Sequence, residues 1–577
     1  MTNAQNGSPR GVAHRRGGSR AATEHPPAPV GLPARFGRNV LMNYAAQGLT
    51  ALTALVLTPV LLHHLGKTTY GLWVVASGAV VYLELFELGF GAASTKLIAE
   101  DASFRPESAL RTLNTTFFVL VPLGALALVG GVGLAFALQH IVHVSPQLRG
   151  ESVAVVILLA VALATSIPGD TFGGALVGHQ RYDLLALANA SMTVATAAVS
   201  IAVVVGGHGV VMLAFATTVV SIVFQLVRLG MVRRILPGTR LSPRLIDPAQ
   251  RRHAMHLSGW FMLQAVLNAV YATGDVITVG IVLGLKDAAI YAVGSKLAGA
   301  VVSALDSMAA VFFPFASAAS RNDRESLGDI ARDGTRVTMV PGIMVALVFI
   351  VLAGPGVRAW VGTGYGVSAQ VLVVLAAAAG LASPVRALGN IGVGLGNVRQ
   401  FCAIKGIEVT VNITLSVTLA LVIGPVGVAI GTLGGVALAR LPGYLVAGCR
   451  ASGLSVRSLL RGALVPNILP AMACATVLLA LRQVIGGSIP LLAVTALAGC
   501  ATYLIVYLST GAAPAERRRA LAFVTRPLPA RWRHGDESAA HQIADNSQCQ
   551  SDSEPGSLDG VGGSASSGVS QRRRHAP

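Results

Sequence analysis

The run Leu65-Gly66-Lys67-Thr68-Thr69-Tyr70-Gly71-Leu72-Trp73 decides the fold, because its first two residues return 218 positions later as Leu283-Gly284. Two further glycine pairs share this offset, and one proline pair is a single residue out of step: Gly178 and Gly396, Gly209 and Gly427, and Pro122 and Pro341. A six-helix block therefore occurs twice. Because six is an even number of spans, the two copies have the same orientation, related by an axis roughly along the membrane normal.

Composition places these blocks in a membrane. Apolar residues make up 53% of the 577 residues and charged residues only 12%, and about 20 apolar helical residues cross a hydrocarbon core of about 30 Å. The hydropathy pattern predicts fourteen spans, at 41–64, 72–94, 113–138, 152–177, 182–205, 209–232, 256–283, 287–318, 337–354, 367–394, 400–423, 426–448, 463–481 and 486–508. Helices are expected because backbone polar groups in lipid must be paired within each segment.

The predicted fold class is therefore an all-α integral membrane protein of about 14 transmembrane helices, with two six-helix lobes in parallel repeat plus two C-terminal helices. The domains expected are a disordered basic tail at 1–37, an N-lobe at 38–232, a linker along the inner membrane surface at 233–255, a C-lobe at 256–449, spans 13 and 14 at 450–510, and a disordered tail at 511–577. The basic residues after the last span are expected either to bind anionic lipid headgroups or only to set the orientation of that span.

The formal charge of +18 has a topological origin. Most basic residues fall on one set of loops, whereas the alternate loops hold only Lys67, Arg149, Lys286, Arg358 and Arg482. The positive-inside rule then puts both termini in the cytoplasm and the alternate loops outside the cytoplasmic membrane. We expect no nucleic-acid partner.

The sequence gives little evidence for an enzyme, a metal centre or a cofactor site. The outer loops are short, whereas membrane glycosyltransferases and polymerases usually need sizeable ones. The five cysteines are scattered without a disulfide or zinc spacing. His63 and His64 are adjacent and cannot share one helix face, so a metal site is not expected. We predict a non-enzyme without metal or cofactor.

Polar residues within the spans are the candidate functional groups, since a charge near the bilayer centre costs at least about 2.5 to 3.5 kcal/mol. The first span carries Asn43, Gln47 and Thr50 on one face, and the seventh carries a longer stripe, namely Gln264, Asn268, Tyr271 and Asp275. Gln47 and Gln264 occupy nearly equivalent repeat positions. The two stripes indicate a shared central cavity between the lobes, or else polar contacts between helices within a lobe.

Carboxylates in the spans are candidates for ion coupling. Glu84 and Glu87 are one turn apart and would repel each other if both were ionised in a dry site, so one is expected to carry a proton. Together with Asp275 they form the candidate coupling set. The alternative is that Glu84 or Glu87 pairs with Lys96 or a hydroxyl group.

Cations in the spans gather in the second lobe. Arg386 shares a helix face with Asn390, and Lys296 lies on another span. Fixed cations in a membrane cavity suit a phosphate or pyrophosphate group, so these residues join the predicted substrate cavity. Lys405 and Glu408, one turn apart, are expected to form an internal ion pair, and Arg440 is interpreted as snorkelling near the cytoplasmic end.

The run at 65–73, with Glu87-Leu88-Gly89-Phe90-Gly91-Ala92 and Ala99-Glu100, resembles the opening of bacterial oligosaccharide flippases of the polysaccharide transporter family. That family belongs to the multidrug/oligosaccharidyl-lipid/polysaccharide exporter (MOP) superfamily. Gly274-Asp275-Val276-Ile277 through Leu283-Gly284 to Ile290-Tyr291-Ala292-Val293 and Lys296-Leu297 resembles the start of its second lobe. Glu87 stands where the family often has Asp.

The resemblance implies a flippase for cell-surface polysaccharide biosynthesis that moves a polyprenyl-pyrophosphate-linked oligosaccharide, or a related glycolipid, by rocking of two lobes. It also implies membrane lipids as partners, with glycosyltransferases or a polymerase of the same pathway as further candidates. The alternative is an ion-coupled multidrug or small-molecule exporter of the same superfamily. Lys296 and Arg386, and an aromatic content of only 5%, count against that alternative.

Overall fold

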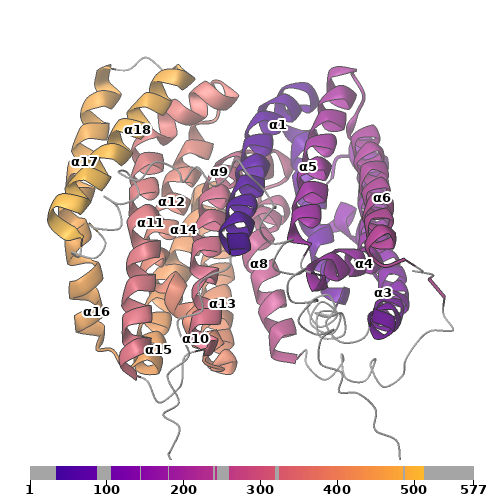
Figure 1. Cartoon of the computed structure of the whole chain (residues 1–577). Helices are drawn as coiled ribbons and strands as arrows, with labels where there is room; N and C mark the ends of the chain where they lie inside the picture. The colour runs from indigo at the N-terminus through magenta and orange to yellow at the C-terminus, as the bar shows by residue number, and fades with distance from the viewer. Residues whose placement is uncertain are drawn as a thin grey trace, which may run out of the picture. The chain divides into compact units, whose positions relative to one another are not determined.

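The computed structural model describes residues 34–87, 106–142, 144–179, 181–237, 241–242, 259–318, 324–484, 488–512 and 517. That part of the chain contains helices and turns and no strand (Figure 1). Its elements are α1 (Ala34–Val81), η1 (Tyr82–Glu87), α3 (Pro106–Ile141), η2 (Pro146–Leu148), α4 (Arg149–Gly178), α5 (Tyr182–Val205), α6 (Val210–Ile235), α8 (Gly259–Val282), α9 (Leu285–Ala310), α10 (Phe312–Ala318), α11 (Arg324–Val361), α12 (Gly366–Gly394), α13 (Val398–Ile423), α14 (Pro425–Gly435), η4 (Val436–Arg440), α15 (Leu441–Ser452), α16 (Val456–Ala463), α17 (Val465–Val484), α18 (Ile489–Val506) and η5 (Tyr507–Gly511).

Thirteen helical segments of the described residues are long and apolar enough to cross a membrane. The first of them, Ala45–Leu85, contains Gly66, whose backbone is not helical, so it consists of two helices that meet at a kink. With that division the segments correspond one to one with the fourteen predicted spans, although the second span is described only as far as Glu87. The predicted fold class is confirmed.

The repeat is visible in the backbone as well as in the sequence. Gly66 has φ 74° and ψ 167°, and its equivalent Gly284 has φ 98° and ψ 174°. This region of backbone space is open essentially to glycine alone. Each lobe therefore makes the same sharp turn between its first two spans, and the turn explains why both copies keep a glycine there.

Each lobe packs its own helices together (Figure 1). In the first lobe α3 and α6 pack against α4, and α5 packs against α1 and α6. In the second lobe α12 packs against α9, α11 and α14, and α13 packs against α8 and α14. The C-terminal pair α17 and α18 packs on α11. The two helices beyond the repeat thus lie against the second lobe.

The lobes meet at the end of the bundle that carries Lys67, Lys286, Arg358 and Arg482. We call it the Lys67 end, and the charge distribution predicts that it faces outside. Gly71 contacts the second lobe so closely that a Cβ there would lie 1.8 Å from the carbonyl oxygen of Leu285. The absence of a side chain at Gly71 is what permits this contact.

A second contact between the lobes depends on a proline. Pro59 lies inside α1 and has no N–H, so the carbonyl of Leu55, four residues earlier, has no helical donor. The indole Nε1 of Trp360, near the end of α11, donates to that carbonyl at 2.6 Å. Pro59 therefore leaves an acceptor free for the opposite lobe.

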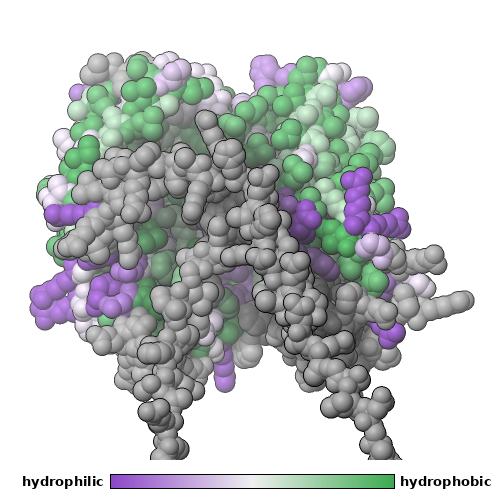
Figure 2. All heavy atoms as spheres, in the orientation of Figure 1, coloured by the Kyte–Doolittle hydropathy of each residue, from purple (hydrophilic) through white to green (hydrophobic). Residues whose placement is uncertain are grey.

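The surface of the helices matches a lipid environment. Figure 2 shows hydrophobic residues over much of the helix faces in the upper part of the view, with hydrophilic residues gathered lower down. Large apolar side chains such as Val422, 79% exposed, and Leu421, 73% exposed, project outward. On a water-soluble protein such a surface would drive association, whereas in a bilayer it contacts acyl chains.

Parts of the predicted domain plan lie outside the described residues. These are nearly all of the tail at 1–37, most of the linker at 233–255, and the tail at 511–577 apart from Gly511, Ala512 and Arg517. The assignment of these segments stays a prediction.

We predict that Gly66→Ala lowers the unfolding free energy by about 1–3 kcal/mol, because alanine is strained in this backbone region. Nothing lies within 4 Å of the site that a methyl group would occupy, so strain is the only expected effect. Thermal unfolding of the purified protein in detergent measures it. Gly133→Ala is the matched control, since Gly133 lies in a helix with equally open space; an equal loss in both variants would contradict the prediction.

Candidate functional site

A cavity of about 540 Å³ lies within the second lobe, among α8, α9, α12, α13 and the segment from α14 to α15. The predicted polar stripe of α8 forms one wall, since Gln264, Asn268, Tyr271 and Asp275 all line the cavity. Their spacing of three or four residues puts them on one helix face. Every lining residue belongs to the second lobe.

Asp275 is held by three donors from three other helices. The hydroxyl groups of Tyr291 and Thr432 donate to Oδ2, at 2.7 and 2.5 Å, and the amide of Asn412 donates to Oδ1 at 3.4 Å. Asn412 in turn accepts from Ser416 at 2.8 Å. These bonds join α8 to α9, α13 and α14 and satisfy the carboxylate. Asp275 is thereby a fixed part of the cavity wall.

Glu408 is the most buried charge of the site, with a side chain that is fully inaccessible. Its Oε2 accepts from Lys405 Nζ at 3.0 Å, and its Oε1 lies 3.7 Å from Arg440 Nη1. The predicted ion pair between Lys405 and Glu408 is confirmed. Lys405 Nζ also lies 3.4 Å from the centre of the Tyr271 ring, a cation–π contact. One carboxylate therefore compensates two cations.

The interpretation that Arg440 snorkels near the cytoplasmic end is wrong. This residue lines the cavity and is 11% exposed, with its guanidinium over the Tyr444 ring at 5.7 Å. Arg440 ends a π-helical turn, Val436–Arg440, between α14 and α15. Such a turn inserts an extra residue and is frequent at functional sites, because it changes the face that the next residues present. Arg440 points inward for this reason and does not snorkel.

Arg386, on α12, is also buried, and it pairs with Asp306 on α9. Asp306 is half-exposed to the cavity. The sequence predicts Arg386 to be a fixed cation of the cavity but does not predict its pairing with Asp306. Asn390, one turn further along α12, lines the cavity and donates to the carbonyl of Arg386 at 3.3 Å.

The lining residues include more cations than carboxylates, although Glu408 directly behind them brings the formal charge of the site to zero. The three cations of the lining are Arg386, Lys405 and Arg440, whereas its two carboxylates are Asp275 and Asp306. Among the described residues, the Nε atoms of Arg386 and Arg440 have no hydrogen-bond partner. Both donors are buried and unsatisfied within this part of the protein.

Two of the remaining predicted cavity residues, Gln47 and Lys296, lie outside this lining. Gln47 on α1 donates to the Ser307 hydroxyl at 2.6 Å, one residue beyond Asp306, and so bridges the lobes at the edge of the cavity. Lys296 is exposed on α9, one turn before the lining residue Gly299. The side chain of Asn43 is outside the described residues. The structure thus brings together five of the eight predicted cavity residues.

The first lobe has a separate polar cluster. Arg228 on α6 pairs with Asp170 on α4 at 2.9 Å, and it also donates to Asn189 at 2.7 Å and to Gln225 at 3.3 Å. Glu84, in the 3₁₀ turn η1, is exposed and lies close enough to Asp170 for the two charges to interact. The side chain of Glu87 and all of Lys96 lie outside the described residues. Their pairing stays a prediction.

The chain is similar to known proteins in sequence and in fold. Residues 36–320 match the family model described as polysaccharide biosynthesis protein. Over these residues the chain is similar to members of that family. The match spans the first lobe and the start of the second, where the sequence resemblance also lies, so the resemblance is confirmed.

A probable flippase, AglR, from Haloferax volcanii is 24% identical to the chain over 408 residues, which make up 69% of the chain and 81% of AglR. Among solved structures, the lipid II flippase MurJ in an inward closed conformation has a TM-score of 0.65 at 11% identity, over 81% of the chain and 97% of MurJ. An inward-facing multidrug resistance MATE family transporter of the MOP superfamily has a TM-score of 0.59 at 15% identity, over 73% of the chain and 99% of the transporter. The chain has the fold of MOP superfamily transporters.

Sequence reasoning does not identify some residues of the cavity. Tyr444 and Thr432 line the cavity without belonging to any polar stripe, and Asp306 pairs with a residue 80 positions away. The flanking Gly435 and Pro442 around Arg440 are the one local signal of an irregular helix. In the described part of the chain no group of three or more His, Cys, Asp or Glu side chains could hold a metal ion.

We predict that Glu408→Gln lowers the unfolding free energy by about 3–5 kcal/mol, because it leaves Lys405 and Arg440 buried without a compensating charge. Thermal unfolding in detergent measures the loss. The double variant Lys405→Met with Glu408→Gln is expected to recover part of it, since only one buried cation then lacks a partner. A single variant as stable as the wild type would show that the carboxylate does not compensate these cations.

Proposed function

We propose that this protein is a flippase that moves a polyprenyl-pyrophosphate-linked oligosaccharide, or a related glycolipid, from the cytoplasmic to the outer leaflet of the cytoplasmic membrane, for cell-surface polysaccharide biosynthesis. The family match and the flippase relative support the class of reaction. The proposal includes both termini in the cytoplasm, as the loop charges predict, and glycosyltransferases or a polymerase of the same pathway as partners.

The observation that carries the proposal is the set of cations around the cavity of the second lobe. Arg386, Lys405 and Arg440 line it, and two guanidinium Nε atoms among them have no partner in the described residues. Arginine donates to phosphate oxygens with favourable geometry, and such charge-assisted bonds are roughly twice as strong as neutral ones. The cavity therefore suits the pyrophosphate of the carrier lipid.

The ion pair between Arg386 and Asp306 suits a site that is filled and emptied in turn. Asp306 is half-exposed, whereas Arg386 is almost fully buried. In the empty site the carboxylate neutralises the guanidinium, and an entering pyrophosphate replaces it. Asp306 then limits the affinity of the site for the pyrophosphate, because the substrate has to displace this carboxylate from Arg386.

The polar residues Gln264 and Asn268, on the same wall, are proposed to contact the sugar or the pyrophosphate. Asp275 shapes that wall through its three hydrogen bonds. Lys296 and Gln47 lie next to the cavity, and we propose that they join the site, with Asn43, when the lobes move. Asn390 holds the backbone of the Arg386 turn.

The contacts between the lobes support alternating access. At the Lys67 end Gly71 touches Leu285 and Trp360 binds the Leu55 carbonyl, so that end is held closed. The substrate then enters from the opposite side, which the charge distribution places in the cytoplasm, once the bond from Gln47 to Ser307 that also joins the lobes has opened. Rocking of one lobe against the other releases it outside.

Export of small cationic compounds is a weaker reading of the same fold. It requires carboxylates that are free to bind a cation, but Asp275 already accepts three hydrogen bonds and Asp306 is paired with Arg386. The charges in this cavity favour an anionic substrate.

We expect Arg386→Gln together with Arg440→Gln to slow translocation at least about tenfold, since two charge-assisted contacts to the pyrophosphate are lost. The measurement is the movement of a fluorescent undecaprenyl-pyrophosphate-linked sugar between the leaflets of reconstituted vesicles.

Arg233→Gln is the matched control, because it removes an exposed cation outside the cavity. Its rate is expected to equal that of the wild type. Wild-type rates in the double variant, with equal amounts of protein in the vesicles, would refute the proposed site.

We further propose that Glu84, with Glu87 and Asp275, couples transport to a proton gradient. An imposed pH gradient should then change the translocation rate of the wild type but not that of Glu84→Gln. Asp329→Asn, which removes an exposed carboxylate paired with Arg332, should keep the wild-type response. A gradient response that persists in the Glu84 variant rules out this role for Glu84.

A further inference from the structure

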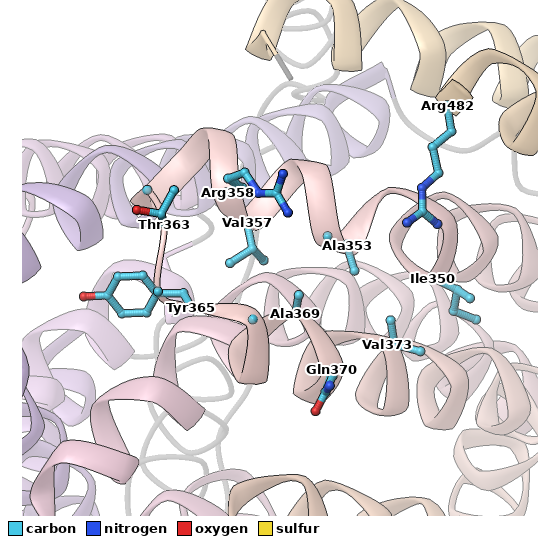
Figure 3. A pocket seen from close by; sticks show the side chains of 14 residues that line it. Ile350, Ala353, Val357, Arg358, Thr363, Tyr365, Ala369, Gln370, Val373 and Arg482 are labelled. Carbon is cyan, nitrogen blue, oxygen red and sulfur yellow. The ribbon is translucent and has the colours of Figure 1, made fainter. Parts of the chain in front are cut away.

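A second pocket, of about 560 Å³, lies at the Lys67 end of the bundle, and its lining shares no residue with that of the cavity. It is formed by the end of α11, the turn at 362–365 and the start of α12, and it is closed on one side by Arg482 from α17 (Figure 3). The pocket therefore joins the second lobe to the C-terminal pair of helices, for which the repeat provides no role.

Three of the five basic residues that the sequence assigns to the outer loops converge on this pocket. Arg358 and Arg482 line it, and Figure 3 shows Arg482 reaching down from its helix toward Ala353 and Ile350. Lys67 touches its rim, since Nζ lies 3.4 Å from the Gly364 carbonyl oxygen and 4.4 Å from the centre of the Tyr365 ring. Such a gathering of scarce charges from three separate loops is not required by topology.

No carboxylate balances these cations within the pocket. Its lining contains neither Asp nor Glu. Between Asp333 and Glu516 the sequence has a single acidic residue, Glu408, and that side chain is buried against Lys405. Arg358 and Arg482 make no ion pair or hydrogen bond with the described residues, and both are exposed. Two guanidinium groups are thus free to bind an anion.

The rest of the lining indicates what kind of anion fits. Thr363 and Gln370 add a hydroxyl and an amide to the polar rim, whereas Ile350, Val357 and Val373 form an apolar wall. A pocket with cations and hydrogen-bond donors at one side and an apolar wall at the other matches a lipid, with its phosphate on the arginines and its chain along the wall.

We propose that Arg358 and Arg482 form a binding site for the phosphate group of a lipid in the outer leaflet. Two lipids share this chemistry: a resident anionic phospholipid, and the polyprenyl-pyrophosphate carrier after it has crossed the membrane. Arg482 gives α17 and α18 a function, because it completes the site from outside the repeat. The inference does not require translocation, so it stands or falls separately from the proposed function.

The test is lipid binding to the purified full-length protein, measured by native mass spectrometry. The probes are dioleoylphosphatidylglycerol, undecaprenyl pyrophosphate and, as a lipid without net charge, dioleoylphosphatidylcholine. In the double variant Arg358→Gln with Arg482→Gln, the affinity of the protein for at least one anionic probe is expected to fall roughly tenfold or more. Affinity for the phosphatidylcholine should not change.

Arg149→Gln is the matched control, since Arg149 is also exposed and predicted to lie outside, but it does not line the pocket. Arg482→Lys keeps the charge and should retain most of the binding. Loss limited to phosphatidylglycerol identifies a resident lipid, and loss limited to undecaprenyl pyrophosphate identifies the carrier. Unchanged binding of both anionic probes, or an equal fall for phosphatidylcholine, would overturn the proposal. If the double variant does not fold, Arg482→Gln against Arg482→Lys gives the same comparison.

Discussion

The compensation of buried charge by Glu408 is the interaction on which the interior of the second lobe depends. Lys405 and Arg440 come from different helices, and both would be costly in a membrane without an opposite charge. Their shared carboxylate lets Lys405 lie against the Tyr271 ring and Arg440 lie over the Tyr444 ring. Three helices around the cavity are positioned relative to one another by this single side chain.

The two lobes use the same helical plan but treat charge differently. In the first lobe Arg228 is surrounded by Asp170, Asn189 and Gln225, so its donors are well supplied within the protein. In the second lobe the cations of the cavity outnumber the carboxylates that line it. The repeat determines the positions of the helices. The substitutions within each copy determine whether its interior cations are paired within the protein or can bind an anion.

The sequence predicts the spans, the repeat and the ion pair of Lys405 with Glu408, because hydropathy and helical spacing are local properties. It also predicts the stripe from Gln264 to Asp275, which faces one cavity. It does not predict contacts between distant segments. Gln47 belongs to a stripe equivalent to that of Gln264, yet its amide is used on Ser307, 260 residues away. The sequence also does not predict that Arg440 lines the cavity, because a π-helical turn changes the helix face in a way that regular helical spacing cannot show.

The bond from Trp360 to the Leu55 carbonyl has an energetic consequence for any motion of the lobes. Pro59 ensures that no amide of α1 can take over when the indole leaves. A carbonyl without a donor in hydrocarbon costs several kcal/mol, so separation at this end needs water or another donor to arrive as the indole departs. If the lobes rock as proposed, hydration of this one backbone oxygen is part of the energy barrier to their separation, and a proline in one lobe raises that barrier for the indole of the other.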